Sequence, residues 1–273
     1  MTSIEKHPVD WAGVWRSMTE EVARKSTVEY WNSRAADYND YILSSGFDHG
    51  RSALRIIQEE GILIKNDKAL DIAAGPGSLS IPLAETGFNV TALEPSDTMG
   101  EYLVENAFRK GLDSIELVLS TWQDVDISPW RDSFDLVICS QALWHFPDLM
   151  DQVVRMEEVS RGWCGVLLGV DDEPEFADLY RALGLRDEEP DRFLIFFNLL
   201  YSHGRFADVR TFQTVMKRSK GSAFSMWEKC AEKFGTLSAA DKKNISNHIE
   251  RCTVDGLYTT TNTMALIWWP VNA

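Results

Sequence analysis

The segment from Leu70 to Ser80, with the sequence LDIAAGPGSLS, limits the possible folds of this chain more than any other segment. An apolar strand runs into a glycine turn, and a helix starts directly after it. In open α/β sheets, turns of this kind lie at the carboxyl ends of the strands, where ligands bind. Gly75 and Gly77 carry no side chain, so a ligand can approach the backbone at these two positions.

Strand and helix patterns alternate on both sides of this turn. Short apolar runs predict strands at 69–74, 89–95, 115–120, 134–140 and 164–170. Between them, helix patterns occupy 78–87, 97–110 and 149–160. Strands that alternate with helices in this way predict an α/β fold, with a parallel sheet covered by helices on both faces.

The two ends of the chain differ from this central part. Before it, Trp11, Trp15, Met18 and Val22 form one apolar helix stripe, which predicts a packing face. After it come a largely helical stretch, a strand, two helix faces and a β-rich end, which suit an antiparallel pair at one sheet edge. We therefore expect four parts. Residues 1–66 form an N-terminal helical segment or lid, and residues 67–170 form a cofactor-binding core. Residues 171–205 form a helical insertion that caps the substrate side, and residues 206–273 form a C-terminal part of the sheet with two helices.

Charge and composition exclude several classes of partner. The formal net charge of -15 makes nucleic acid a poor candidate substrate, because an acidic surface repels phosphate. No signal peptide and no apolar run of about 20 residues occurs, so we expect a cytoplasmic protein that does not enter a membrane. The four cysteines match neither a zinc site nor a disulfide framework, and we expect no bound metal.

Two kinds of cofactor compete for the glycine turn. A dinucleotide needs GxGxxG, but the third glycine position here is Ser80. Asp71, in the strand before the turn, would repel a pyrophosphate and suits a ligand that carries an ammonium group, such as the methionine part of S-adenosylmethionine (SAM). Glu94 ends the second strand and suits ribose hydroxyls in either case.

Four ordered segments, DIAAGPG, ALEPS, STWQDV and SFDLVICSQALWHF, resemble the motifs of class I SAM-dependent methyltransferases. The resemblance covers roughly residues 30–170. The family's first motif glycine is replaced here by Ala73. The resemblance implies a Rossmann-like three-layer sandwich whose seven-stranded, mostly parallel sheet has an antiparallel C-terminal strand, plus N-terminal helices. It also implies SAM as cofactor and S-adenosylhomocysteine (SAH) as product.

The resemblance also implies positions for the cofactor. Residues near its methionine end would be Asp71, Ala73, Gly75 and Gly77. Residues around its ribose and nucleoside would be Glu94, Pro95 and Met99, and residues that frame adenine would be Thr121, Trp122, Gln123 and Asp124. Residues near the sulfonium would be Ser140, Gln141 and Ala142. N-terminal residues that would cover the cofactor or reach its carboxylate are Tyr30, Tyr38 and Arg34.

Methyl transfer from SAM needs an aligned nucleophile more than a strong acid or base. If a base is used, His145 is the first candidate, since it follows the fourth strand and histidine titrates near neutral pH. Trp144 and His145 are also the candidate contacts to the acceptor.

We therefore expect a SAM-dependent methyltransferase that acts on a small molecule by direct displacement. Two other interpretations stay open at this stage: a SAM-binding partner or sensor without turnover, and an NAD-dependent oxidoreductase. The aromatic N-terminal helices fit either a lid or a homodimer contact.

Overall fold

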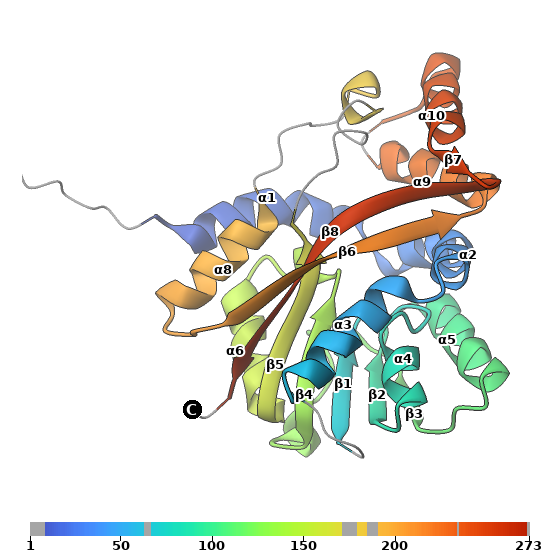
Figure 1. Cartoon of the computed structure of the whole chain (residues 1–273). Coiled ribbons are helices and arrows are strands. Elements are labelled where there is room, and N and C mark those ends of the chain that lie inside the picture. The colour runs from blue at the N-terminus through green and yellow to red at the C-terminus, as the bar shows by residue number, and fades with distance from the viewer. Residues whose placement is uncertain (1–8, 63–66, 171–178, 185–190, 234, 272–273) are drawn as a thin grey trace, which may run out of the picture.

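The computed structural model describes residues 9–62, 67–170, 179–184, 191–233 and 235–271, which surround one central sheet (Figure 1). Seven strands follow the order β3-β2-β1-β4-β5-β8-β6, and the short β7 pairs with β8. Their bounds are β1 Lys68–Ile72, β2 Asn89–Leu93, β3 Ile115–Val118, β4 Phe134–Ser140, β5 Ser160–Gly169, β6 Asp208–Arg218, β7 Thr253–Val254 and β8 Leu257–Pro270.

The direction of the strands confirms the predicted fold class. The strands from β3 to β5 are parallel to their neighbours, whereas β8 runs antiparallel to both β5 and β6. Because β8 inserts between β5 and β6, the C-terminal strand lies inside the sheet and not at its edge. The chain order reverses between β1 and β4, and a ligand crevice forms at such a switch point.

Helices cover both faces of the sheet, as predicted. On one face lie α6 (Leu149–Val159), α1 (Trp11–Lys25) and α8 (Arg192–Ser202), and on the other α3 (Asp48–Glu59), α4 (Ser80–Glu85) and α5 (Asp97–Arg109). Alternate residues of β1 belong to the two faces: Leu70 and Ile72 pack with the first group, and Ala69 packs with the second. Asp71 therefore points to the side where α4 begins.

The apolar stripe of α1 packs on the first of these faces. Trp15 is 1% exposed, and its indole N–H donates a hydrogen bond of 2.8 Å to the carbonyl of Phe146. Trp11 and Met18 lie against the same core cluster. This packing brings the N-terminal helices across the carboxyl ends of the parallel strands.

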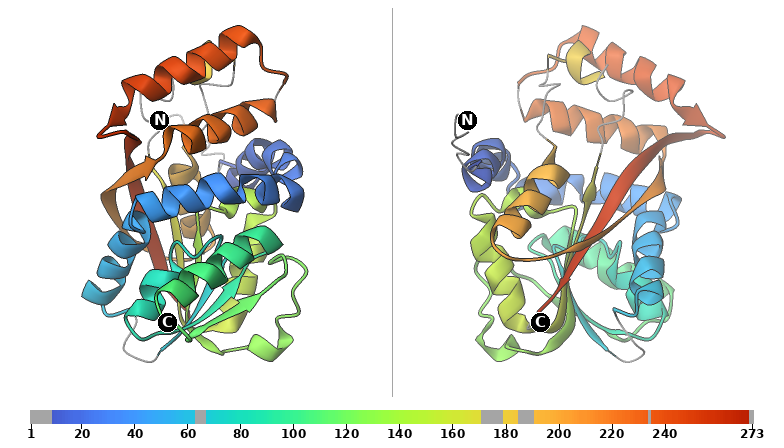
Figure 2. Two further views of the ribbon diagram at one scale, coloured as in Figure 1. Left: turned by 90° about the vertical axis from the view of Figure 1, so that its right-hand side faces the viewer. Right: turned by 60° about the vertical axis from the view of Figure 1, so that its left-hand side comes forward.

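The C-terminal residues form a lobe that extends beyond the parallel sheet. There, β6 and β8 carry α9 (Lys220–Glu232) and α10 (Ala239–Arg251), with α2 (Val28–Ser44) between this lobe and the sheet (Figure 2). Trp227, Ile245 and Tyr258 are buried in a core cluster of their own. The lobe and α2 thus stand over the switch point.

The predicted helical insertion is described only in part. Residues 171–178 and 185–190 lie outside the described residues. Within the remainder, Ile195, Phe196 and Leu199 of α8 are buried in the core cluster that also contains α1 side chains. One face of the apolar run is therefore buried, whereas Leu194 and Tyr201 are exposed.

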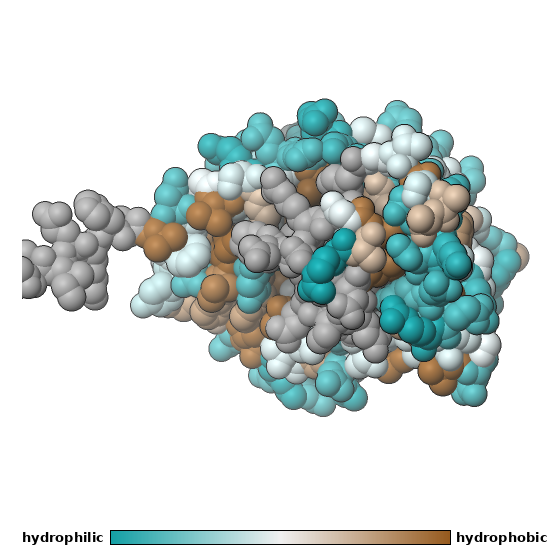
Figure 3. Space-filling model, turned by 90° about the horizontal axis from the view of Figure 1, so that it is seen from above, coloured by the Kyte–Doolittle hydropathy of each residue, from teal (hydrophilic) through white to brown (hydrophobic). Residues whose placement is uncertain are grey.

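The face seen from above carries mostly hydrophilic side chains where it is described (Figure 3). Seen from above, apolar side chains gather on the side where α1 begins, and most of the other coloured surface is hydrophilic (Figure 3). Among the described helices, none combines the length and the apolar character that crossing a bilayer requires.

Candidate active site

The glycine turn after β1 takes a left-handed backbone conformation at several positions. The φ angles are 58° at Ala73, 56° at Gly75 and 93° at Gly77. Such an angle costs a residue with a side chain about 1–2 kcal/mol, so Ala73 occupies a conformation that glycine adopts freely. A Cβ atom on Gly75 would meet nothing closer than 3.8 Å, whereas one on Gly77 would lie 2.7 Å from Ile81 Cγ1. Gly75 therefore borders open space, and Gly77 allows α4 to pack closely.

Asp71 is fully buried behind this turn. Its Oδ2 accepts a hydrogen bond of 2.6 Å from the Ser80 hydroxyl, and its Oδ1 has no partner among the described residues. Burial raises the pKa of the Asp71 carboxyl to about 7, although the bond from Ser80 acts in the opposite direction. The carboxyl is therefore held by the first residue of α4.

Glu94, after β2, is turned toward the glycine turn. It is 5% exposed, and its two oxygens accept backbone hydrogen bonds of 2.8 Å from Gly75 and 2.9 Å from Ser96. Burial raises the pKa of Glu94 to about 7, and the nearby Asp71 charge adds to the rise. Each carboxylate oxygen has more than one acceptor site, so Glu94 can still accept hydrogen bonds from a ligand.

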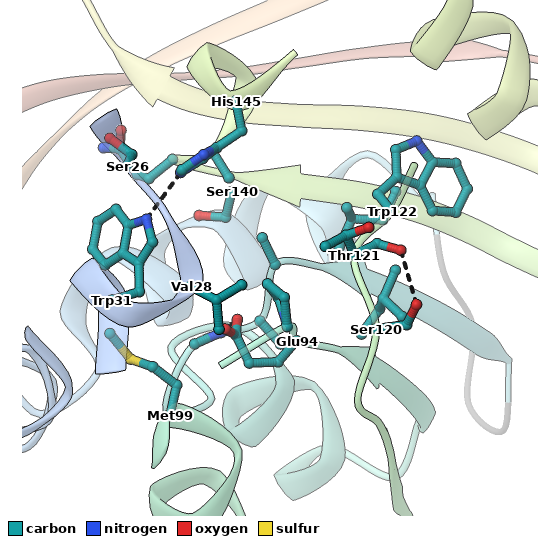
Figure 4. Close-up of a pocket in the computed structure, with 18 of the residues that line it drawn as sticks. Ser26, Val28, Trp31, Glu94, Met99, Ser120, Thr121, Trp122, Ser140 and His145 are labelled. Atoms are coloured by element: carbon teal, nitrogen blue, oxygen red, sulfur yellow. Dashed lines mark hydrogen bonds between the residues drawn. The ribbon is translucent and has the colours of Figure 1, made fainter. Parts of the chain in front are cut away.

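A first cavity of about 280 Å³ opens beside Gly75 and Glu94, at the carboxyl ends of the parallel strands (Figure 4). Thirteen of the residues expected at the site line it: Tyr38, Ala73, Gly75, Glu94, Pro95, Met99, Thr121, Trp122, Gln123, Ser140, Gln141, Ala142 and His145. Six do not: Tyr30, Arg34, Asp71, Gly77, Asp124 and Trp144.

Residues that follow β3 line the first cavity and are stabilised by contacts outside it. Trp122 belongs to the main core cluster and lines the cavity as well. Arg155 lies with its guanidinium carbon 5.0 Å from the ring centroid of Trp122 and donates a hydrogen bond of 3.1 Å to its carbonyl. Asp124 accepts a hydrogen bond of 2.6 Å from the Thr121 hydroxyl, so it holds the side chain of a cavity residue.

Trp31 and His145 meet across the first cavity. The Trp31 indole N–H donates a hydrogen bond of 3.2 Å to His145 Nε2 (Figure 4). Burial, helped by the charge of Lys233, lowers the pKa of His145 to about 4. The imidazole is therefore neutral at pH 7, and the lone pair of its Nε2 is already occupied.

The end of β4 contributes two further features. The Ser140 hydroxyl is buried and has no hydrogen-bond partner among the described residues. Gln141 has a φ angle of 55°, a strained conformation for a residue with a side chain. Strain of this kind is held by the surrounding structure and is common at functional sites.

A second cavity of about 530 Å³ adjoins the first, and Trp31, Tyr38 and Gln141 line both. Its charged lining residues are Arg34, Asp191, Arg192 and Arg218, and its aromatic ones include Trp144, Tyr180, Trp227 and Tyr258. Among the lining residues that come after β5 in the sequence, most belong to β6, α9 and β8. Tyr180, Asp191 and Arg192 come from the predicted insertion.

Residues 70–163 match a family described as a methyltransferase domain. The chain is 30% identical over 122 residues to glycine N-methyltransferase of Rattus norvegicus, covering 42% of this chain and 36% of that enzyme. It is 24% identical over 250 residues to an uncharacterized protein of Haemophilus influenzae, covering 89% of each. The fold resembles that of magnesium protoporphyrin IX methyltransferase from Synechocystis, solved with bound SAH, with a TM-score of 0.50, 14% identity, and 80% and 81% of the two chains covered.

The chain contains a methyltransferase domain, and its fold is that of class I SAM-dependent methyltransferases. Enzymes of this family use SAM as methyl donor and release SAH. The sequence prediction of family, fold class and cofactor is therefore confirmed.

Two N-terminal residues of the methyltransferase lie away from the first cavity. Arg34 makes three hydrogen bonds of 2.8–3.0 Å to Asp37 and one of 2.8 Å to the Tyr30 hydroxyl. It also donates a hydrogen bond of 3.1 Å to Cys230 Sγ. Arg34 borders the second cavity and Tyr30 lines neither, because α2 turns both side chains toward α9.

Sequence reasoning did not single out Trp31, which contacts both cavities of the methyltransferase. Its seven-residue spacing from Tyr38 was the available signal, since positions two helical turns apart share one face. The connection between α1 and α2 was missed as well. Ser26 and Thr27 of this connection line the first cavity, together with Ala23 near the end of α1 and Val28 at the start of α2, and no motif marks them.

Proposed function

We propose that this methyltransferase binds SAM in the first cavity and transfers its methyl group by direct displacement to a small molecule held in the second. One observation carries the proposal: the two cavities meet at Trp31, Tyr38 and Gln141. A donor on one side of this junction and an acceptor on the other would have their reacting atoms together.

Glu94 and two unpartnered polar atoms support the fit of the cofactor. Glu94 would accept hydrogen bonds from the ribose hydroxyls, and Thr121 to Gln123 would surround adenine. The buried Ser140 hydroxyl and Asp71 Oδ1 have no partner among the described residues and are available for polar groups or bound water. Asp71 would act through water or through Ser80, since it does not line the cavity.

The bound cofactor supplies a methyl group activated by a positively charged sulfonium. The chain's own contribution is alignment and exclusion of water, which can lower a barrier by roughly 7–11 kcal/mol for well-held reactants. We propose that the N-terminal helices α1 and α2 form the lid and that the C-terminal lobe, together with the start of α8, forms the acceptor side. His145 would then orient Trp31 and act as a positioning residue, because its Nε2 is occupied and its pKa is low.

A small acceptor is supported by three observations. The net charge of -15 opposes binding of a nucleic acid backbone. In addition, a relative that shares the methyltransferase domain is named for glycine, a small amine. The acceptor cavity of about 530 Å³ has the size of an ordinary small-molecule site.

Calorimetric titration tests the cofactor half of the proposal. We expect SAM and SAH to bind with a dissociation constant of about 1 μM, equivalent to about -8 kcal/mol, and NAD to show no heat of binding. Binding of NAD in place of SAH would contradict the proposal, and so would the absence of binding by all three compounds.

The affinity for SAH should depend on pH through Glu94. Its carboxylate form accepts hydrogen bonds from hydroxyl groups, and its pKa in the ligand-free protein is raised to about 7. Affinity should therefore fall as the pH drops below about 7, by up to about tenfold per pH unit, and level off above this value. Asp71, whose pKa is also about 7, provides the control: the slope should persist in Asp71→Asn. A flat profile from pH 5.5 to 8 would argue against the role given to Glu94.

A further inference from the structure

Arg218 is a buried cation at the wall of the second cavity. It is the last residue of β6, is 6% exposed and lines the second cavity. Its Nη1 has no hydrogen-bond partner among the described residues. Buried polar groups are nearly always paired, and a guanidinium offers five donors, so such a group at a cavity wall points to a ligand.

The guanidinium of Arg218 is fixed in position. Its central carbon lies 4.8 Å from the ring centroid of Tyr41, which is 2% exposed. The Tyr41 hydroxyl shares a hydrogen bond of 2.8 Å with Nδ1 of the buried His49, so the ring that supports Arg218 is itself held. A ligand would therefore meet a preorganised cation, which lowers the entropic cost of binding.

The charges around Arg218 do not cancel. Asp37 is the buried carboxylate nearby, and its three short hydrogen bonds go to Arg34. Arg218 Nη1 lies 3.8 Å and Lys229 Nζ 4.0 Å from the same carboxylate. Among the described residues, three cations thus lie within 4.0 Å of one buried carboxylate, an excess of positive charge beside Arg218 in a chain whose net charge is -15.

Apolar and aromatic side chains make up most of the rest of the second cavity. Leu168, Met216 and Met226 contribute apolar surface, and Trp144 and Trp227 contribute indole rings. Asp191 is the acidic residue among the described lining residues, and it accepts a hydrogen bond of 3.1 Å from the Leu194 backbone as the cap of α8. The lining thus combines Arg218 and two further arginines, Arg34 on Asp37 and Arg192 over the Trp144 ring, with a large apolar and aromatic wall.

We propose that the methyl acceptor is a small organic carboxylate whose carboxylate pairs with Arg218 and whose apolar or aromatic body packs against Trp144 and Trp227. A planar guanidinium can hold a carboxylate by two parallel hydrogen bonds. The nucleophilic atom would lie at the other end of the molecule, near Trp31 and Gln141. This inference rests on the proposed function, since it assigns the acceptor to the second cavity.

Matched pairs of compounds test the inference. Indole-3-acetate and 4-hydroxyphenylacetate, each beside its carboxamide, are titrated by calorimetry into the full chain saturated with SAH. We expect each carboxylate to bind about tenfold or more tightly than its amide, as a charge-assisted hydrogen bond predicts. Arg218→Met should remove this preference. Arg210→Met, on the same strand but paired at the surface with Glu59 and Glu60, should retain it.

Three results would overturn the inference. The first is equal binding of acid and amide, and the second is a preference for the acid that survives Arg218→Met. The third is no binding of either carboxylate when its concentration is raised in 10-fold steps to about 10 mM. If Arg218→Met does not fold, Arg218→Lys keeps the charge but loses the planar fork, and the preference should then shrink without vanishing. Saturation with SAH is measured first in every variant. If the wild-type protein does not bind SAH, the proposed function itself is refuted. If it binds SAH but does not prefer the acid to the amide, only the acceptor class is refuted.

Discussion

Glu94→Gln is expected to lower the affinity for SAH about 100-fold, the largest effect of a single substitution on cofactor binding in this chain. The charged carboxylate would accept the ribose hydroxyls, and such charge-assisted hydrogen bonds contribute about 1.5–3 kcal/mol each. A glutamine side chain has one acceptor oxygen, and its NH₂ group would also face the N–H donor of Gly75 or Ser96. Calorimetry with SAH measures the loss directly.

Glu101→Gln provides the matched control. Glu101 is exposed on α5, the helix that begins three residues after Glu94, and the substitution removes the same charge. We expect its affinity for SAH to stay within about twofold of the wild type, because exposed charges contribute little. If the two variants bind SAH equally well, Glu94 does not hold the ribose. If Glu94→Gln is weaker but keeps the pH slope, a different group titrates.

Much of the fold was predictable because its signals are local. The apolar strands and the glycine-closed helices of the central part fall within a few residues of their predicted bounds, as at β4, Phe134–Ser140. The antiparallel C-terminal strand was stated through the family resemblance, but its insertion between β5 and β6 was not predicted, since strand order depends on contacts between distant residues. The extension of β6 and β8 into a separate lobe was not predicted, because no turn or linker in the sequence marks where they leave the sheet.

The candidate site divides in the same way. Residues on the strand-end turns, such as Gly75 and Glu94, line the first cavity because strand ends meet at one edge of a parallel sheet. Helical residues were harder to predict, since a shift of one position rotates a side chain by about 100°. Thus Trp31, and not Tyr30, lines both cavities. Arg218 belongs to a basic stretch whose charge alone predicts a solvated surface, and only the tertiary packing buries it.

The glycine turn also depends on a residue outside the motif. A Cβ atom built on Gly50, in the first turn of α3, would lie 1.9 Å from the carbonyl oxygen of Ser78 and 2.9 Å from its carbonyl carbon. Both contacts are with backbone, which cannot rotate out of the way as a long side chain can. The helix therefore packs directly against the turn that borders the first cavity, and only glycine at this position permits that approach.

Gly50→Ala is accordingly expected to lower the free energy of unfolding by about 3 kcal/mol, within the upper range for overpacked sites. Gly221→Ala is the matched control, since Gly221 lies in the first turn of α9 and its Cβ would meet nothing within 4 Å. There the same substitution should stabilise the protein by up to about 1 kcal/mol, because alanine favours the helix. Urea unfolding of both variants gives the comparison. Opposite signs are expected, and equal shifts would mean that α3 does not support the turn. Because the turn would move with α3, the Gly50→Ala protein that remains folded should also bind SAH more weakly.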